Sequence, residues 1–168
     1  MEIRKEKPED FAAVRRVNEL AFGQSAEATL VEALRGAGQA MLSLVALEND
    51  RVVGHILFSP VTITGASGPD QVLGLAPMAV LPERQKSGVG TLLVKTGLDE
   101  CWRLGYRAVV VLGHPDYYPR FGFVPAGRFG LNCEYDAPEE AFMALELEPG
   151  ALGSRGGTVK FHPEFKNV

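Results

Sequence analysis

Two apolar segments separated by an amphipathic one constrain the fold of this 168-residue chain more than any other feature. Residues 72–81 are almost wholly apolar, as in a strand covered on both faces, and residues 108–112 repeat that pattern. Between them, residues 88–104 predict a helix with a broad apolar face made of Val89, Leu92, Leu93, Thr96, Leu98 and Trp102. A strand, a helix and a second strand in this order predict a right-handed crossover between parallel strands.

The segments on either side predict a mixed sheet with helices on both faces. A helix is expected to begin at Lys7-Pro8-Glu9-Asp10, with an apolar stripe of Phe11, Val14, Val17 and Leu20. Ser25 is expected to cap a second helix that ends near Gly36. Further strands are expected at residues 2–6, 42–48, 51–60, 142–147 and 158–161, a tight turn at 49–50, a short turn at 116–120, and loops at 64–70 and 150–157. The predicted fold class is α+β, with three layers in the order α/β/α.

Composition narrows the class of protein and its partners. Hydrophobic residues make up 46% and charged residues 23%, which are globular proportions, and one domain is expected over residues 1–168. The formal net charge of -4 argues against nucleic acid or an anionic membrane as a partner. Cys101 and Cys133 lie in no CxxC motif or metal-ligand spacing, so reduced thiols, no metal and a cytoplasmic location are expected. We see neither a signal peptide nor an apolar run of about 18 residues.

The segment from Val80 to Thr91 carries the most specific chemistry. A buried strand is followed by a polar loop and by a helix that opens with Gly88 and Gly90. The first N–H groups of a helix have no partner within it and carry partial positive charge, and glycines let a phosphate approach the backbone closely. The segment matches neither a Walker A loop nor a dinucleotide-binding fingerprint. The first needs a glycine before Lys95, and the second needs a glycine at position 93, which is leucine. The alternative is that the glycines only permit tight helix packing.

The order Val80-x-Pro82-x-x-Gln85-x-x-Gly88-x-Gly90 resembles the acyl-CoA signature of the GNAT superfamily of N-acyltransferases. Residues 117–123 resemble the family's late Tyr-x-x-x-Gly-Phe segment, and residues 52–60 resemble the third strand of a bacterial branch of uncharacterised members. The resemblance covers roughly residues 1–125. It implies the GNAT fold, a central mixed and mostly antiparallel sheet whose fourth and fifth strands splay apart.

The resemblance implies acetyl-CoA as the acyl donor and a small-molecule or protein amine as the acceptor, and it leaves a homodimer open. Tyr118 occupies the position of a tyrosine that protonates the CoA thiolate. The donor-binding residues that it implies are Met78, Ala79 and Val80 for the pantetheine arm and thioester, and Gln85, Lys86, Ser87, Gly88, Val89, Gly90 and Thr91 for the pyrophosphate.

The sequence departs from the family pattern in three places. Lys86 stands where glycine is frequent, the link from Gly113 to Asp116 is short, and residues 72–81 contain no carboxylate to serve as general base. His114, in a loop before a proline, is the candidate base, whereas His55 on a strand is better explained as a structural residue.

The second predicted helix carries two carboxylates, Glu27 and Glu32. Glu27 and Glu32 are best explained as surface charge. The alternative, a role toward a cationic acceptor, is implied only by the resemblance, because the first two helices of that family border the acceptor pocket. A non-catalytic acyl-CoA-binding sensor and a structural domain without a ligand are the alternative functions.

Overall fold

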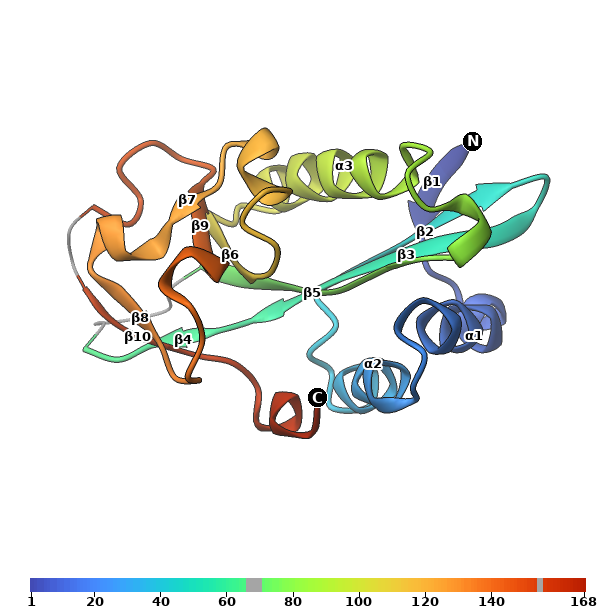
Figure 1. The fold of residues 1–168 in the computed structure, drawn as a ribbon, viewed down its shortest axis with the longest axis horizontal. Coiled ribbons are helices and arrows are strands. Elements are labelled where there is room, and N and C mark those ends of the chain that lie inside the picture. The colour runs from blue at the N-terminus through green and yellow to red at the C-terminus, as the bar shows by residue number, and fades with distance from the viewer. Residues whose placement is uncertain (66–70, 154–155) are drawn as a thin grey trace. The chain divides into compact units, whose positions relative to one another are not determined.

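A computed structural model describes residues 1–65, 71–153 and 156–168 (Figure 1). The predicted loops at 64–70 and 150–157 therefore lie partly outside the described residues. The chain divides into two compact units. The first unit comprises residues 1–59, 76–100 and 163–168, and the second comprises residues 60–75 and 101–162. Each unit is described by itself, and the single domain expected from the sequence stays a prediction.

The first unit is built on an antiparallel sheet. Strand β1 (Glu2–Lys5) pairs with β2 (Leu42–Glu48), and β2 pairs with β3 (Arg51–Pro60). The β2–β3 turn has φ of 52° at Asn49 and 62° at Asp50, the left-handed pair whose twist suits a two-residue hairpin. The end of β5 (Val72–Val80) lies beside β3, since the Leu81 N–H donates to the Val53 carbonyl at 2.9 Å. The hairpin predicted from the sequence is confirmed.

Helices cover both faces of this sheet. A 3-10 turn (Pro8–Asp10) leads into α1 (Phe11–Phe22), and α2 (Ala26–Gly36) lies on the same face (Figure 1). Helix α3 (Val89–Arg103) covers the opposite face. A Cβ atom at Gly97 of α3 would lie 2.6 Å from the Phe58 ring of β3, so glycine allows this helix to approach the sheet. Ser25 is the N-cap residue of α2, but its side chain makes no cap hydrogen bond.

The predicted apolar stripes of two helices are partly wrong. Val14 and Val17 of α1 are buried, but Leu20 is 45% exposed. Phe11 and Leu20 are nine residues apart, which at about 100° per residue places them about 180° apart around the helix. Steps of three therefore drift off the buried face. In α3, Leu92 and Trp102 are exposed, and the buried face is formed by Val89, Leu93, Val94, Gly97, Leu98 and Cys101.

The second unit joins parallel and antiparallel pairing. The first residues of β5, Val72–Gly74, pair in parallel with Ala108–Val110 of β6 (Ala108–Leu112), which confirms the predicted crossover. All five residues of β6 pair with β9 (Phe142–Glu146), and β9 pairs with β7 (Val124–Pro125). Pairing between β5 and β6 is thus confined to the beginning of each strand.

A small second sheet completes this unit. Strand β10 (Gly157–Lys160) pairs with β4 (Thr62–Ile63) and β8 (Leu131–Cys133). Strands β4, β7 and β8 escaped prediction because two or three residues are too short to show a period. The remaining 3-10 turns of this unit are Tyr118–Phe121, Ala126–Phe129 and Glu139–Ala141, and those of the first unit are Pro82–Arg84 and Pro163–Asn167.

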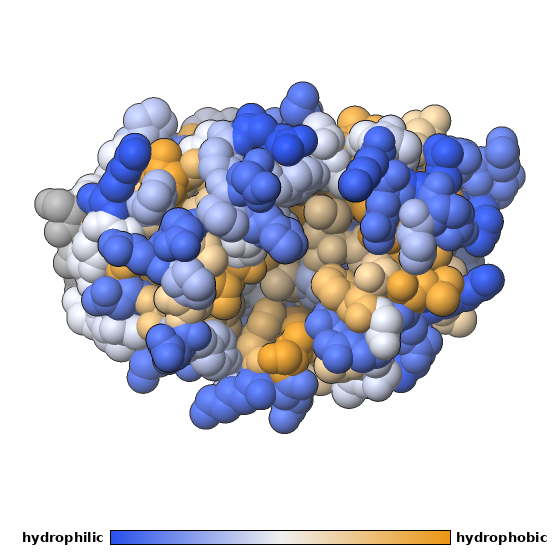
Figure 2. Space-filling view, viewed as in Figure 1, coloured by the Kyte–Doolittle hydropathy of each residue, from blue (hydrophilic) through white to orange (hydrophobic). Residues whose placement is uncertain are grey.

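The molecular surface shows both hydrophilic and apolar residues, as the globular composition predicts (Figure 2). Hydrophilic side chains make up much of the face seen in Figure 2, and apolar residues show between them. In the part of the chain that the structure describes, no helix is both long enough and apolar enough to cross a bilayer.

Candidate functional site

The loop between β5 and α3 is held by two side chains that bond to its own backbone. The Gln85 side-chain amide donates to the Val80 carbonyl at 3.1 Å, and the Ser87 hydroxyl donates to the Arg84 carbonyl. The Gly88 carbonyl then accepts from the Leu92 N–H at 3.0 Å, which begins the helical bonding of α3. Gln85 therefore ties the end of the strand to the start of the helix.

Two residues of this loop have left-handed backbone conformations. Lys86 has φ of 62° and Gly88 has φ of 93°. A left-handed φ favours glycine, which gives a physical reason for the frequent glycine at the position that Lys86 occupies here. A Cβ atom at Gly88 would meet nothing within 4 Å, so tight packing does not explain this glycine. The space beside Gly88 is open, as close approach of a ligand to the backbone requires.

The main-chain groups near the end of β5 face two different edges. The Leu81 N–H bonds to β3, and successive residues of a strand alternate between the two edges. By this alternation Ala79 faces β3, whereas Met78 and Val80 face the opposite edge, where Val80 accepts from Gln85. Beyond Gly74, no described strand pairs with β5 on that edge. The polar groups of Met78 and Val80 are thus positioned to bond an extended ligand.

Tyr118 in the second unit is a buried tyrosine, 7% exposed. Its ring covers Gly113, where a Cβ atom would lie 2.5 Å from the ring, and it meets the Tyr117 ring edge-on at 5.1 Å between centroids. Burial, followed by the neighbouring Tyr117, raises the pKa of the Tyr118 hydroxyl. The hydroxyl therefore stays protonated near neutral pH, and it makes no hydrogen bond to another described residue. The glycine at position 113 has a structural reason, since the Tyr118 ring occupies the space of a side chain there.

The two candidate histidines lie in opposite environments. The His114 side chain is exposed, and its main-chain carbonyl accepts from the Tyr117 N–H at 3.1 Å. His55 is completely buried, and burial, together with the charge of Arg35, lowers the pKa of its imidazole to about 3. An imidazole with no solvent contact cannot exchange protons with a substrate amine. The structure supports the interpretation of His55 as a structural residue.

His55 is the centre of a buried polar chain. The Ser43 hydroxyl donates to the Glu6 carboxylate at 3.2 Å, so its single proton is used there. The His55 Nε2–H must then donate to the Ser43 oxygen at 2.8 Å, which leaves His55 Nδ1 to accept from the Asn18 amide at 3.2 Å. Arg35 completes the chain with an ion pair to Glu6 at 2.8 Å. These bonds join β2, β3 and Glu6, the residue after β1, to α1 and α2.

The two glutamates of α2 differ from one another. Glu32 is an exposed residue whose carboxylate pairs with Arg15 at 2.6 Å, as expected of surface charge. Glu27 is buried, so its interpretation as surface charge is wrong.

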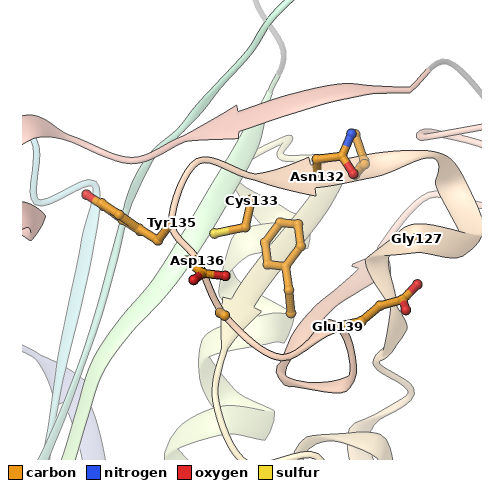
Figure 3. Close-up of a pocket in the computed structure, with 9 residues that line it drawn as sticks. Gly127, Asn132, Cys133, Tyr135, Asp136 and Glu139 are labelled. Carbon is orange, nitrogen blue, oxygen red and sulfur yellow. The ribbon is translucent and has the colours of Figure 1, made fainter.

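The second unit contains a pocket of about 140 Å³ that the sequence did not reveal (Figure 3). The carboxylates of Asp136 and Glu139 and the thiol of Cys133 belong to its lining. The Tyr135 ring extends away from Cys133 and stacks on Phe161 at 6.0 Å. The lining residues come from separate short elements, so no motif could have identified them. Among the described residues, no group of three His, Cys, Asp or Glu side chains is arranged to hold a metal ion.

Comparisons with known proteins identify the family. The family model described as "Acetyltransferase (GNAT) domain" matches residues 2–126. The uncharacterized N-acetyltransferase YhbS of Escherichia coli is 39% identical over 166 residues, 98% of each chain. The crystal structure of E. coli YhbS in complex with CoA has a TM-score of 0.93 at 38% identity, and the match covers 98% of this chain and 91% of that one. A GNAT family acetyltransferase from Brucella melitensis, solved with acetyl-CoA, has a TM-score of 0.81 at 40% identity and coverage of 98% and 97%.

The chain belongs to the GNAT family of acetyltransferases. The fold class expected from the sequence, a mixed and mostly antiparallel sheet with helices on both faces, is confirmed.

Proposed function

We propose that this protein is a cytoplasmic N-acetyltransferase that moves the acetyl group of acetyl-CoA to a primary amine. The observation that carries the proposal is the open backbone at Gly88, next to the Gln85–Val80 bond at the start of α3. Two relatives of about 40% identity were solved with CoA and with acetyl-CoA, which supports the same donor here.

The residues of the first unit bind and orient the donor in this proposal. The N–H groups at the start of α3 and the Lys86 charge bind the pyrophosphate, because a helix N-terminus attracts anions. The main chain of Met78 and Val80 bonds the pantetheine arm, and a backbone N–H near Val80 stabilises the oxyanion. Ala79 contributes less directly, since its main chain faces β3. Gln85, Ser87, Val89, Gly90 and Thr91 complete the donor-binding segment.

The proposed reaction is direct attack on the thioester. The neutral amine nitrogen forms a bond to the acetyl carbon, and the carbon–sulfur bond breaks. Tyr118 gives its proton to the departing thiolate, and His114 accepts the proton that the amine loses. Burial raises the pKa of the Tyr118 hydroxyl, so near neutral pH it carries the proton that this role requires. The acceptor is a small-molecule amine or a protein amine.

Calorimetric titration with acetyl-CoA tests the donor site, and free CoA provides the comparison. Gly88→Ala is expected to weaken binding about tenfold, because a Cβ atom would fill the space through which the ligand approaches the backbone. Gly23→Ala is the matched control, since Gly23 also has a left-handed φ, of 69°, and open space around it. Equal binding by both variants, or no binding of either compound to the wild type, would contradict the donor site.

Thiol release with a panel of amines tests catalysis. Tyr118→Phe is expected to lower kcat by about a hundredfold or more while acetyl-CoA affinity is unchanged, because only the proton donor is removed. The neighbouring Tyr117→Phe is the control and should keep kcat within a few-fold. The missing carboxylate in β5 favours the alternative function, a non-catalytic acyl-CoA-binding module. Tight acetyl-CoA binding with no turnover of any amine would support that alternative.

A further inference from the structure

Two ion pairs join the β5–α3 loop, residues 81–88, to the tip of the β2–β3 hairpin. Arg84 pairs with Glu48, the last residue of β2. Glu83 pairs with Arg51, the first residue of β3, at 3.3 Å. Figure 1 shows the 3-10 turn that carries Glu83 and Arg84, in green, lying against this hairpin. The loop and the hairpin belong to the same unit. The loop is thus attached to an element other than the strand and the helix that it connects.

The hairpin tip places its two charges side by side. Glu48 and Arg51 are directly opposite each other in the register of β2 and β3, so their side chains lie on the same face of the hairpin. On the loop, Glu83 and Arg84 are successive residues of one short turn. Opposite charges meet in both pairs, whereas the reverse orientation of the loop would bring like charges together. The four charges therefore favour one orientation of the loop on the hairpin.

The conformation of the loop requires restraint. Lys86 has a left-handed φ of 62°, which is unfavourable for a residue with a Cβ atom. The side chains of Gln85 and Ser87 bond to carbonyls within residues 80–87, so these two bonds hold the loop only against its own segment of chain. The two ion pairs hold it against a different part of the sheet.

The two pairs differ in their exposure to water. The side chains of Arg84 and Glu48 are 34% and 36% exposed, and the Arg84 Nε atom is itself buried. The side chains of Arg51 and Glu83 are each 55% exposed. Water and salt screen an exposed pair more strongly than a partly covered one. We therefore expect the Glu48–Arg84 pair to contribute more than the Arg51–Glu83 pair.

We propose that the two ion pairs hold the β5–α3 loop in the conformation that binds acetyl-CoA, which makes their four side chains positioning residues. This inference rests on the proposed function. The Ser87 hydroxyl bonds to the Arg84 carbonyl, so a displacement of Arg84 also displaces the residues that lead to Gly88. When a pair breaks, fewer molecules hold the binding conformation, and the apparent affinity decreases by that fraction.

The sign of the change in affinity distinguishes this role from a direct effect of charge. Acetyl-CoA is an anion, so removing a nearby glutamate charge would strengthen its binding if charge alone mattered. Positioning by the ion pairs predicts the opposite result. Glu48→Gln and Glu83→Gln are therefore the informative substitutions, because each removes a negative charge and breaks one pair.

Calorimetric titration with acetyl-CoA measures this sign. Glu48→Gln should raise the Kd about threefold, and Glu48→Gln combined with Glu83→Gln should raise it about fivefold to tenfold. Glu32→Gln is the matched control, since it removes the same charge from an ion pair with Arg15 in the same unit, and it should not raise the Kd. In turnover assays, KM for acetyl-CoA should rise while kcat stays nearly unchanged. Unchanged or tighter binding by both glutamate variants, or a fall in kcat at constant KM, would overturn the proposal.

Limited trypsin digestion measures the restraint without any ligand. Cleavage after Lys86, followed by mass spectrometry, should be about threefold faster in Glu48→Gln than in the wild type and in Glu32→Gln, because local opening exposes the loop. Equal rates after Lys86, or the same acceleration at sites outside the loop and the hairpin, would overturn the proposal whether or not acetyl-CoA binds. Faster cleavage after Lys86 in a protein that does not bind acetyl-CoA would support the restraint and refute the proposed function alone.

Discussion

Replacing His55 with glutamine should remove an acid-sensitive component of the free energy of unfolding. The imidazole is completely buried, and its Nε2–H donates to Ser43 while its Nδ1 accepts from Asn18. A second proton on the ring would leave Nδ1–H facing the Asn18 amide hydrogens. The guanidinium of Arg35, which forms an ion pair with Glu6 in the same hydrogen-bonded network, would also repel a charged His55 imidazole. The folded protein therefore holds His55 in its neutral form.

The magnitude follows from the difference in pKa between the folded and unfolded states. Burial lowers the pKa of His55 from 6.5 to about 3 in the folded state. As pH falls below 6.5, the unfolded chain binds a proton that the folded chain does not bind, so stability decreases with decreasing pH until about pH 3. Between pH 7 and pH 5 this difference amounts to about 2 kcal/mol.

Urea unfolding at pH 7 and at pH 5 measures the effect. At pH 7, His55→Gln should lower the free energy of unfolding by about 1–3 kcal/mol, because buried hydrogen bonds are lost. At pH 5 the gap between wild type and variant should shrink by about 2 kcal/mol, since glutamine does not titrate. His114→Gln, which changes an exposed side chain, is the control. A gap of the same size at both pH values would refute the argument that His55 is held neutral.

Two further predictions concern packing and thiol chemistry. Gly97→Ala should destabilise the protein by about 1–3 kcal/mol, because the new Cβ atom would lie 2.6 Å from the Phe58 ring. The control, Gly36→Ala, places its Cβ atom in open space and should be near neutral or stabilising. Equal unfolding midpoints of the two variants would contradict the close contact between α3 and β3. Burial raises the pKa of the Cys133 thiol, so its alkylation by iodoacetamide at pH 8 should be slower in the folded protein than in the urea-unfolded chain, and should accelerate as pH rises. The buried Cys101 should stay unmodified until the protein unfolds. Equal rates of Cys133 alkylation in the two states, measured by mass spectrometry, would argue against a buried thiol.

The local patterns of the sequence were sufficient to predict the strand and the helix on either side of the loop at residues 81–88. Alternation, turn residues and apolar runs predicted the elements of the β2–β3 hairpin and of the β5–α3–β6 crossover, because each of these patterns repeats within a few residues. The order of Gln85, Gly88 and Gly90 indicated the family, which the comparisons confirm.

Tertiary structure decided which of these side chains are covered and by what. Spacing places Glu27 and Glu32 on a helix, but only the surrounding elements bury the first and pair the second with Arg15. The same holds for His55, whose pKa is lowered first by burial and then by the charge of Arg35, a residue of α2 far from it in the chain. Burial and pairing depend on contacts between residues far apart in the chain, and a local pattern does not encode them. The sequence by itself therefore determined the family and the loop between β5 and α3, and the packing of the helices on the sheet decided the charge state and partners of the buried polar groups.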